Sequence, residues 1–545
     1  MAQDVETFDY IVIGAGSAGS VVAARLSEDS SKTVCVLEAG PSDRHLFIHV
    51  PAGYIKTLFN PAYTWPFKSE PVPGIDNRVI ATTQGRTLGG SSSINGLIYN
   101  RGQATDFNSW AQAGNRGWGY DDVLPYFKRG ERRIADVDPQ YHGTSGELPI
   151  SDLDWSHPLL KPFIAGAQGL GIPFNRDYNG AAQEGVGTYQ RNIHKGRRIS
   201  AYRAYLHPAR YRTNLSIRTN AHATAILFDG MRAIGVRYQS GGRSGAERIV
   251  HARREVILCG GALNTPRLLQ VSGIGPAPLL NDIGVPVVRD IAGVGENLRD
   301  HYAVRMVAQV KGLVTLNELS RGPRLWLQVA RWFLRQPSML AVSPSLVHVF
   351  WKSNPALSNA DIQVTFTPAS YMEGIAGLLD VIPGMTCGVW QQRPESLGYV
   401  RAKTRDAFDD PAIQPNYLDH EIDKQVQIAG VRLGRQLLST PPLSPYFDRE
   451  VQPGLDVQRD DEILDYLRRK GSTVFHFIGT ARMGPSTDPR AVVDDQLRVH
   501  GVTGLRVADA SIMPSMPSAN TNAATMMIGE KAADMILGKA PPSGH

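Results

Sequence analysis

The chain has 545 residues, a length that predicts two domains because a single hydrophobic core rarely grows so large. With 42% hydrophobic and 20% charged residues its composition is that of a globular protein, and a net charge of +6 is mild. No long Lys/Arg run occurs, so we expect no nucleic-acid partner. The three cysteines lack metal-ligand and disulfide spacing, and no apolar run could span a bilayer. We therefore expect a cytoplasmic protein with no metal and no integral membrane segment.

The first 40 residues contain the pattern of a dinucleotide-binding unit. Residues 10–13 predict a buried strand, which is followed by a G-x-G-x-x-G turn, a helical pattern and a second strand over residues 33–37. Gly14 allows a sharp turn, Gly16 lets the backbone approach a pyrophosphate, and Gly19 lets helix and strand pack closely. Glu38 ends the second strand, where its carboxylate can accept hydrogen bonds from ribose hydroxyls. The stretch indicates a dinucleotide but does not choose between nicotinamide and flavin.

Later segments repeat this alternation of strands and glycine-rich turns. Residues 84–95, QGRTLGGSSSIN, place small side chains and free N–H groups in a row, which suits a flat ring or a phosphate. Residues 214–271 predict several strands and then a helix after a Gly-Gly turn. From residue 473 onward, short strands precede an amphipathic helix that begins after Asn520. We assign residues 1–154, 203–310 and 471–545 to a discontinuous cofactor-binding domain of Rossmann-like α/β type.

The rest of the chain, residues 155–202 and 311–470, has a different character. Its strand-like pieces predict an antiparallel sheet flanked by helices, an α+β substrate domain interleaved with the first. We expect residues 361–368 and Trp390 to face the cofactor. A helical pattern over residues 323–335 carries arginines along one stripe and large apolar side chains elsewhere. We favour a mostly buried helix with a solvated arginine edge; the alternative is a basic amphipathic helix resting on a membrane.

Four motifs resemble the glucose–methanol–choline (GMC) family of flavin-dependent oxidoreductases, along essentially the whole chain. The family's two signatures correspond to GRTLGGSSSIN, residues 85–95, and GALNTPRLL, residues 261–269, the latter continuing to SGIG. Its closing block corresponds to HFIGTARMG and NTNAATMMIGEKAAD. The resemblance implies FAD as the cofactor and hydride removal from an alcohol carbon. Some relatives attach their flavin through a histidine where this chain has Ile94, so non-covalent FAD is expected.

The resemblance also implies which residues form the site. His476 corresponds to the family's active-site base and Asn520 to its second active-site position. A neutral imidazole is suited to take a hydroxyl proton, and an amide can donate to the developing alkoxide. Asn520 is also a candidate helix cap, and His222 and His301 are expected to be structural. The implied cofactor-binding residues are Gly14, Gly16, Ser17, Ala18, Gly19, Glu38, Ala39, Trp65, Arg86, Gly89, Gly90, Ser92, Asn95, Gly96, His222, Ala223, Asp509, Ala510, Asn520 and Thr521.

The predicted activity is therefore FAD-dependent oxidation of an alcohol to an aldehyde or ketone. The substrate is expected to be a small-molecule alcohol, and the electron acceptor oxygen or a quinone-type compound. The alternative is a lyase or decarboxylase of the same fold that uses FAD without net alcohol oxidation. We expect a monomer or homodimer.

Overall fold

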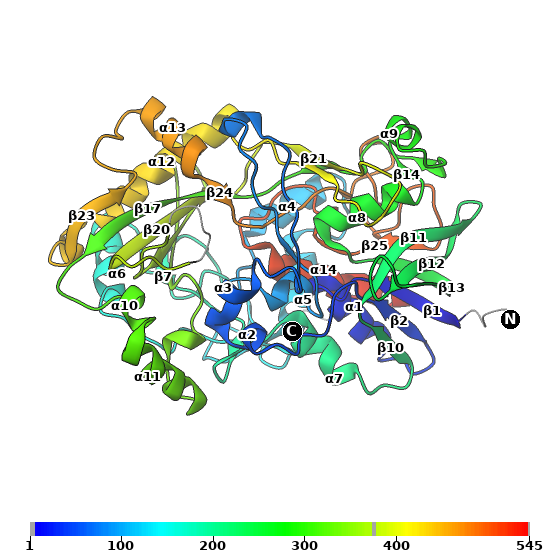
Figure 1. Ribbon diagram of the computed structural model, residues 1–545, viewed down its shortest axis with the longest axis horizontal. Helices are drawn as coiled ribbons and strands as arrows, with labels where there is room; N and C mark the ends of the chain where they lie inside the picture. Colours follow the sequence, from blue (N-terminus) through cyan, green and yellow to red (C-terminus); the bar gives the residue numbers. More distant parts are fainter. Residues whose placement is uncertain (1–5, 373–377, 543–545) are drawn as a thin grey trace.

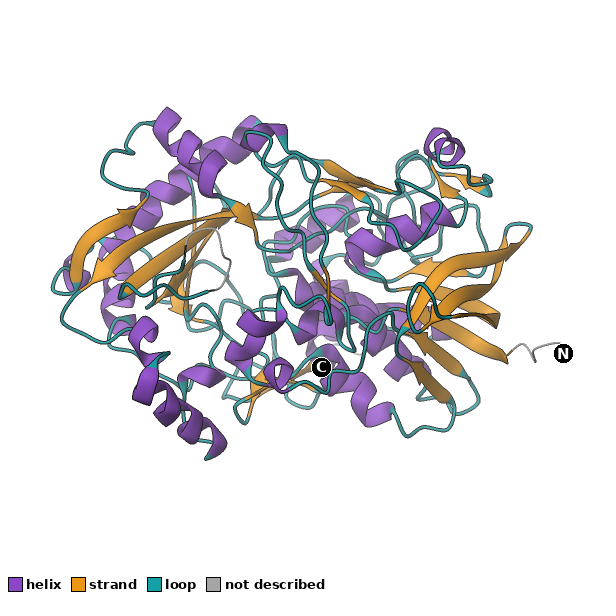
Figure 2. Ribbon diagram, viewed as in Figure 1, coloured by secondary structure: helices purple, strands orange, loops and turns teal. Residues whose placement is uncertain are grey.

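A computed structural model describes residues 6–372 and 378–542. Two large sheets lie at opposite ends of the molecule, with most of the helices packed between them and around the second sheet (Figure 1). Figure 2 shows the same arrangement by element type, with strands gathered at the two ends. This mixed α/β architecture, with one Rossmann-like half and one antiparallel half, confirms the predicted fold class.

The first sheet is built around the expected dinucleotide-binding strands. β1 (Glu6–Ile13) pairs in parallel with β2 (Val34–Leu37) and β13 (Ala246–Leu258), and β10 (Leu215–Arg218) and β25 (Leu505–Val507) extend the parallel part. β12 (Arg232–Ser240) and β11 (Ala221–Asp229) continue it as an antiparallel edge. β2 and the second half of β1, Tyr10–Ile13, are buried on both faces, which accounts for their continuous apolar sequence.

Three helices of this half begin beside one another in space although they are far apart in sequence. α1 (Ser17–Leu26), α8 (Gly261–Val271) and α14 (Thr521–Leu537) start after Gly16, Gly260 and Asn520, and all three of these preceding residues border one cavity. α14 packs on α1 at the small residue Gly529, where an added Cβ would lie 2.9 Å from the carbonyl oxygen of Ala18. Free N–H groups and the positive ends of three helix dipoles therefore converge on the cavity.

The second sheet is antiparallel, in the order β23–β17–β20–β19–β18–β7 with β24 beside β17; its edge strands are β23 (Phe447–Gln452), β7 (Gly185–Thr188) and the short β24 (Ser472–Thr473). β17 (Tyr302–Val310) pairs with β20 (Gly384–Gln391), and β19 (Ile362–Thr367) pairs with β20 and with β18 (Val347–Trp351). Helix α12 (Glu421–Leu438) packs on the outer face, closely enough at Gly434 that an added Cβ would lie 2.1 Å from Met306 Cε. The predicted boundary at residue 310 is wrong, because β17 belongs to this sheet.

The remaining elements connect and cover the two sheets. The other helices of at least six residues are α4 (Ala104–Gln112), α5 (Tyr120–Gly130), α6 (Leu160–Gly169), α9 (Ala277–Asp282), α11 (Gly322–Phe333) and α13 (Asp460–Lys470). The short ones are α2 (Leu46–His49), α3 (Tyr54–Thr57), α7 (His207–Ala209) and α10 (Leu316–Leu319). The other strands of at least three residues are β5 (Glu131–Arg133), β6 (Leu148–Ile150), β7 (Gly185–Thr188), β16 (Glu296–Leu298), β21 (Gly398–Arg401), β22 (Ala412–Gln414) and β23 (Phe447–Gln452). Within the described ranges no helix is both long and apolar enough to cross a membrane.

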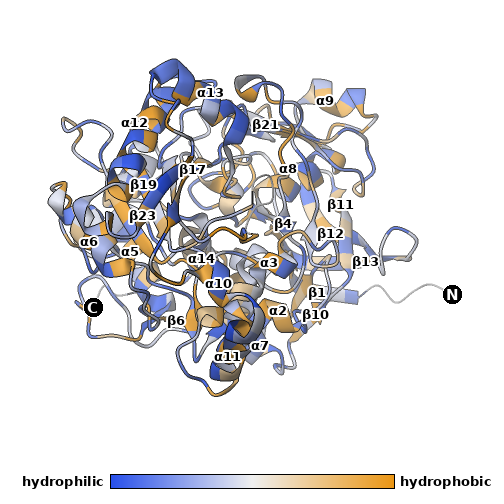
Figure 3. Cartoon of the chain, turned by 60° about the vertical axis from the view of Figure 1, so that its left-hand side comes forward, coloured by the Kyte–Doolittle hydropathy of each residue, from blue (hydrophilic) through white to orange (hydrophobic). Residues whose placement is uncertain are grey.

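Helix α11 differs from its predicted environment. The helix exists, but only Gln328 and Trp332 are buried, and Trp326 and Phe333 are 73% and 68% exposed. From hydropathy alone, we expected the apolar side chains of this helix to be buried against the rest of the substrate domain. The structure instead places α11 at the edge of the second half (Figure 1), and the hydropathy colours of Figure 3 show both hydrophobic and hydrophilic residues on this helix.

Candidate active site

A cavity of about 860 Å³ runs from the first sheet to the inner face of the second. Its walls include the carboxyl ends of β1, β2 and β13, the starts of α1, α8 and α14, and the strands β17, β19 and β20. Ligand sites in open parallel sheets lie beyond the carboxyl ends of the strands. The cavity is thus placed to hold a long ligand whose two ends meet different domains.

The G-x-G-x-x-G turn gives each glycine a different physical task. Gly14 has φ +98°, and a Cβ there would lie 2.4 Å from the carbonyl oxygen of Cys259. At Gly19 a Cβ would lie 1.9 Å from the carbonyl oxygen of Gly14. At Gly16 a Cβ would meet no protein atom closer than 4.0 Å. The first two positions therefore require glycine for folding, whereas Gly16 keeps open the space in front of α1.

Glu38 is held at the end of β2 by the turn that it faces. Its Oε2 accepts a hydrogen bond from the Ala15 N–H at 2.9 Å, and its Oε1 accepts one from the Gly40 N–H at 2.8 Å. Burial raises the pKa of the Glu38 carboxyl to about 7, although these two N–H groups lower it. The carboxylate borders the cavity and is fixed in position to accept hydrogen bonds from a ribose.

An aromatic recess follows beyond Glu38. The His222 ring lies edge-on to Trp65 at 5.3 Å and to Phe408 at 4.2 Å between centroids. Burial, together with the charges of Arg267 and Arg86, lowers the pKa of His222 to about 3, so the ring is neutral. A neutral aromatic recess of this kind suits a flat base such as adenine.

Asp509 secures the start of α8. Its Oδ2 accepts hydrogen bonds from the Gly261 N–H at 2.8 Å and the Thr265 hydroxyl at 2.6 Å, and its Oδ1 accepts two from Ser511. Burial raises the pKa of the Asp509 carboxyl above its usual range. Asp509 follows β25, and its carboxylate therefore connects the end of this strand to the start of α8, which faces the cavity.

Most of the predicted site residues meet at this cavity. Four predicted cofactor-binding residues do not line it: Gly19, Arg86, Gly89 and Ser92. Gly19 packs α1 on β1, and the Arg86 guanidinium lies 5.2 Å from the Trp65 ring. The Gly89 N–H donates to the Ala15 carbonyl and the Ser92 hydroxyl to the Gly89 carbonyl, so both support the wall from behind. The residues that do line it are Gly14, Gly16, Ser17, Ala18, Glu38, Ala39, Trp65, Gly90, Asn95, Gly96, His222, Ala223, His476, Asp509, Ala510, Asn520 and Thr521.

We expected residues 361–368 and Trp390 of the second sheet to face the cofactor, and some of these residues reach the cavity. Thr365, Thr367 and Trp390 line it. Asp361 does not, because its carboxylate accepts hydrogen bonds from the Ser353 N–H and hydroxyl.

A chain of hydrogen bonds at the cavity wall fixes the tautomer of His476. His301 Nε2 lies 2.7 Å from the Gln392 carbonyl oxygen, which can only accept, so His301 carries its proton on Nε2. Burial lowers the pKa of His301 to about 4, so the ring is neutral and its Nδ1 is an acceptor. His476 Nδ1 lies 2.8 Å from that nitrogen and must donate to it. His476 Nε2 is left unprotonated, 3.1 Å from the Asn520 amide Nδ2, which donates to it.

The electrostatic surroundings keep His476 in this neutral form. Burial is the main cause that lowers its pKa well below the usual value, and the neighbouring His301 lowers it further. The unprotonated Nε2 of His476 and the side-chain amide of Asn520 therefore face the cavity together. This is the arrangement required to remove a proton from a hydroxyl group and to hold the resulting oxygen.

Asp300 supports the backbone on which His476 sits. Its Oδ1 accepts the His476 N–H at 2.7 Å, and its Oδ2 accepts the Tyr417 and Thr473 hydroxyls, each at 2.5 Å. Burial raises the pKa of Asp300 to about 6. Phe475, immediately before His476, has φ +65°, a strained value for a residue with a side chain. The Asp300 network holds this strained turn in place.

The sequence interpretation missed Asp300, Gln392 and the relation of His301 to His476. His301 was expected to be structural, whereas it contacts the candidate base directly. In the sequence, His301 is only a histidine that precedes the alternating pattern of β17. This pattern carries no information about a contact with a residue 175 positions away.

The residues of the cavity fit flavin adenine dinucleotide. The N-termini of three helices meet beside the space that Gly16 leaves open, where a pyrophosphate would bind. The Glu38 carboxylate and the aromatic recess follow, at the positions that a ribose and an adenine would occupy. Asn520 Oδ1 is buried without a hydrogen-bond partner among the described residues, an orphan atom at the point where a ligand would lie. No group of three or more His, Cys, Asp or Glu side chains within the described ranges could hold a metal ion.

Fold and site together define a dinucleotide-binding oxidoreductase with a neutral histidine at the junction of its two halves. The GMC oxidoreductase family matches residues 8–303 with its N-terminal part and residues 394–529 with its C-terminal part. The chain belongs to this family. It is an FAD-dependent enzyme that oxidises alcohols. The relatives described below are dehydrogenases and an oxidase, and none of these is a lyase.

Individual relatives agree on the class and differ in the substrate. The chain is 40% identical to "Alcohol dehydrogenase [acceptor]" of Pseudomonas putida over 98% of its own length and 96% of the relative's. It is 39% identical to mitochondrial choline dehydrogenase of Homo sapiens, over 98% and 90%. Among solved structures, pyridoxine 4-oxidase from Mesorbium loti is 31% identical with a TM-score of 0.87, covering 98% of this chain and 100% of that one.

Proposed function

We propose that His476 Nε2 removes the hydroxyl proton of an alcohol while Asn520 holds the alcohol oxygen. The observation that carries this proposal is the direction of the hydrogen-bond chain: only one tautomer satisfies His301 and Gln392, and it leaves a lone pair on Nε2. A neutral imidazole can accept the proton, and an amide N–H can stabilise the alkoxide without competing for that proton.

Hydride removal from the alcohol carbon becomes possible once the hydroxyl proton is leaving, and FAD when bound supplies the acceptor for that hydride. The start of α1 and Glu38 would hold the pyrophosphate and ribose, and Trp65 and His222 the adenine. Gly90 and Asn95 would border the flavin ring, and the positive end of α14 would lie near it. We propose a non-covalent cofactor, since an isoleucine, Ile94, occupies the wall beside Asn95.

The electron acceptor is proposed to be oxygen or a quinone-type compound, and the location cytoplasmic, supported by three buried, unpaired thiols. The reaction itself is tested under anaerobic conditions. A primary alcohol should bleach the flavin absorbance of the purified holoenzyme, and peroxide detection beside a dye assay then identifies the acceptor. A flavin spectrum unaffected by any alcohol in a broad panel would contradict the proposal.

The role of His301 gives a testable prediction with a pH readout. Asparagine can place an amide oxygen near the position of the histidine Nδ1, whereas leucine offers no acceptor. We expect His301→Leu to lower kcat roughly 10- to 100-fold, and His301→Asn to retain most of the wild-type kcat, at equal FAD content.

The pH dependence of the wild type gives a second test. Because only neutral His476 is a base and its pKa is lowered, wild-type kcat/KM should fall only below the usual histidine range, under about pH 6.5. Equal losses in both variants, or a wild-type acid limb above pH 6.5, would contradict this role.

A further inference from the structure

The inner face of the second sheet forms the floor of the cavity beside His476. Because side chains alternate along a strand, Ala303, Arg305 and Val307 of β17 share this face, and all three line the cavity. Trp390 of β20 pairs with Ala303, and its ring lies 6.3 Å from the His476 ring. Arg305 is two residues farther from the base, about 7 Å along the strand.

The Arg305 guanidinium is not engaged by any acid of the described protein. Its Cζ lies 4.8 Å from the centre of the Tyr371 ring, and no carboxylate among the described residues lies within ion-pair distance of it. The residue paired with it on β20 is Gly388, so no side chain on that strand covers the guanidinium from the neighbouring position. At Gly388 a Cβ would lie 2.9 Å from Thr365 Oγ1.

The charge of this end of the cavity is positive. Among the described lining residues the only carboxylates are Glu38 and Asp509, which belong to the cofactor-binding half and are held by backbone N–H groups and hydroxyls. Arg78 also lines the cavity, but it already donates to the carbonyl of Gly471 at 3.0 Å. Among the described residues, a quaternary ammonium group beside Arg305 would therefore find no compensating carboxylate.

We propose that Arg305 binds an anionic group, a carboxylate in the first instance, on the alcohol whose hydroxyl lies at His476. This proposal rests on the proposed function. The substrate is then a hydroxy acid with several bonds between its hydroxyl and its carboxylate. A planar guanidinium pairs with a carboxylate through two parallel hydrogen bonds, so recognition is directional as well as electrostatic. This specificity separates the chain from its choline-oxidising relatives.

The test compares 4-(hydroxymethyl)benzoate with its methyl ester, which has the same shape and no charge, and with choline. The wild-type holoenzyme should prefer the acid over the ester by about 10- to 100-fold in kcat/KM. Arg305→Met should abolish the preference by losing activity on the acid and keeping activity on the ester. Arg305→Glu should reject the acid and gain activity on choline.

The outcomes separate the two proposals. Arg321→Met, a change of an exposed arginine outside the cavity, is the matched control and should leave the preference intact. Equal kcat/KM for acid and ester in the wild type, with no change in Arg305→Met, would overturn the anion site while leaving alcohol oxidation standing. Absence of flavin bleaching by every compound would overturn the proposed function instead.

Helix α11 carries a second, independent inference. With 100° per residue, its two buried residues, Gln328 and Trp332, lie on one side of the helix. They dock it through the Trp332 indole N–H, which donates to the Gly196 carbonyl at 2.7 Å, and the Gln328 Oε1, which accepts the Met339 N–H at 3.1 Å. The opposite side points away from the protein. It carries Trp326, Leu327, Phe333 and Leu334, which are 73%, 56%, 68% and 70% exposed.

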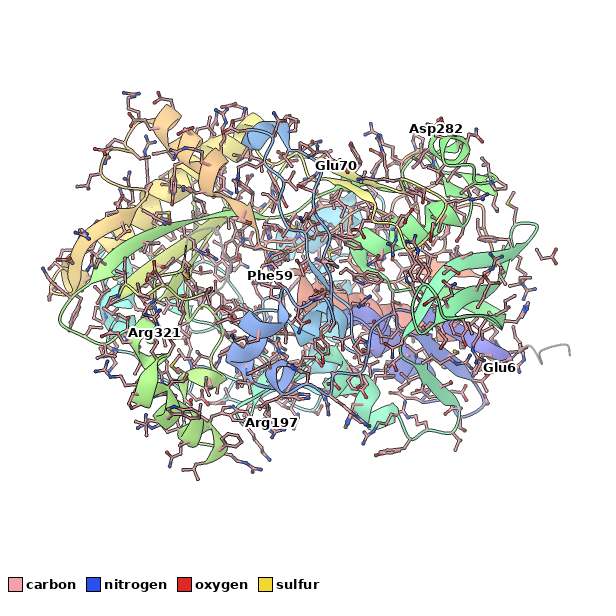
Figure 4. The ribbon with its side chains drawn as sticks, in the orientation of Figure 1. Glu6, Phe59, Glu70, Arg197, Asp282 and Arg321 are labelled. Atoms are coloured by element: carbon pink, nitrogen blue, oxygen red, sulfur yellow. The ribbon has the colours of Figure 1, made fainter. Side chains whose placement is uncertain are left out.

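The charged residues of the helical segment itself, residues 321–335, are all of one sign. Residues 321–335 contain Arg321, Arg324, Arg331 and Arg335 and no acid. All four arginines are exposed, and Arg324 makes one long contact of 3.7 Å with Glu318 on α10. Figure 4 labels Arg321 where the chain enters α11 at the edge of the molecule. Long arginine side chains can reach phosphate groups while neighbouring aromatic and leucine side chains enter the acyl boundary.

We infer that α11 rests on the surface of an anionic lipid bilayer. Charge complementarity favours this occupant, because a partner protein that covered only the apolar face would leave the arginine flank unmatched. Each basic residue near an anionic membrane contributes on the order of 1 kcal/mol, and the apolar side chains add their own burial. The helix lies in the interface plane and does not span it.

Flotation with vesicles tests this inference on the holoenzyme. The wild type should float with vesicles that contain phosphatidylglycerol, bind phosphatidylcholine vesicles at least 10-fold more weakly, and be released by high salt. Trp326→Ser combined with Phe333→Ser should remain at the bottom of the gradient at unchanged turnover of soluble substrate. Leu455→Ser is the matched control, because Leu455 is 74% exposed in the segment between β23 and α13. Failure of the wild type to float, or a wild-type dimer that the double substitution converts to monomer, would overturn the membrane assignment.

Discussion

Replacing His476 by alanine is expected to lower kcat with a primary alcohol by about 10²- to 10⁴-fold while the protein keeps its FAD. The imidazole Nε2 is the unprotonated nitrogen that faces the cavity, and the chain Asn520–His476–His301 offers no second base in line with it. Steady-state kinetics of the flavin-loaded variant measure the loss. The absorbance ratio of flavin to protein shows whether FAD is retained.

The matched control is His251→Ala. His251 lies on β13 in the first sheet and is not among the residues that line the cavity, so its replacement should leave kcat within about twofold. A His476→Ala variant that retains a third or more of wild-type kcat would remove His476 from the mechanism. A variant that has lost its FAD would instead assign the residue to the integrity of the site.

Local sequence predicts the cofactor half well because its constraints are local. The glycines of the first turn, the carboxylate of Glu38 and the strands around them follow from a backbone that must bend and approach a ligand within 25 residues. His301 could not be assigned in this way. The tautomer of His301 is fixed by the carbonyl of Gln392, which lies one residue past β20, and only the three-dimensional pairing of β17 with β20 brings these two residues together.

Helix α11 was predicted as a helix and wrongly placed. Its periodicity correctly gave an amphipathic helix, but an apolar face has the same sequence pattern whether it packs on the protein or points into a lipid phase. Arg305 illustrates a similar limit. An arginine in a strand with alternating small apolar neighbours says nothing about which cavity it enters until the register with Gly388 and Trp390 is known.

Substitution of Gly19 by alanine should prevent stable folding of the cofactor half. The added Cβ would lie 1.9 Å from the Gly14 carbonyl oxygen and 3.0 Å from Cys259 Cβ, and the first of these is backbone that cannot rotate away. Overpacking of this kind costs about 3 kcal/mol or more of unfolding free energy. We expect poor expression or a lowered midpoint of denaturant unfolding, with and without added FAD.

Gly16→Ala should separate cofactor binding from folding. Gly16 has an extended backbone with φ −75°, outside the left-handed region, and its Cβ would meet no protein atom closer than 4.0 Å, so the unfolding midpoint of the FAD-free protein should stay close to that of wild type. The same Cβ would project into the space in front of α1 that a pyrophosphate needs. The Kd for FAD should therefore rise at least 10-fold, about 1.4 kcal/mol, as measured by titration of the stripped protein. If Gly16→Ala bound FAD as tightly as wild type, the pyrophosphate would not lie against α1, and the first glycine motif would serve the fold alone.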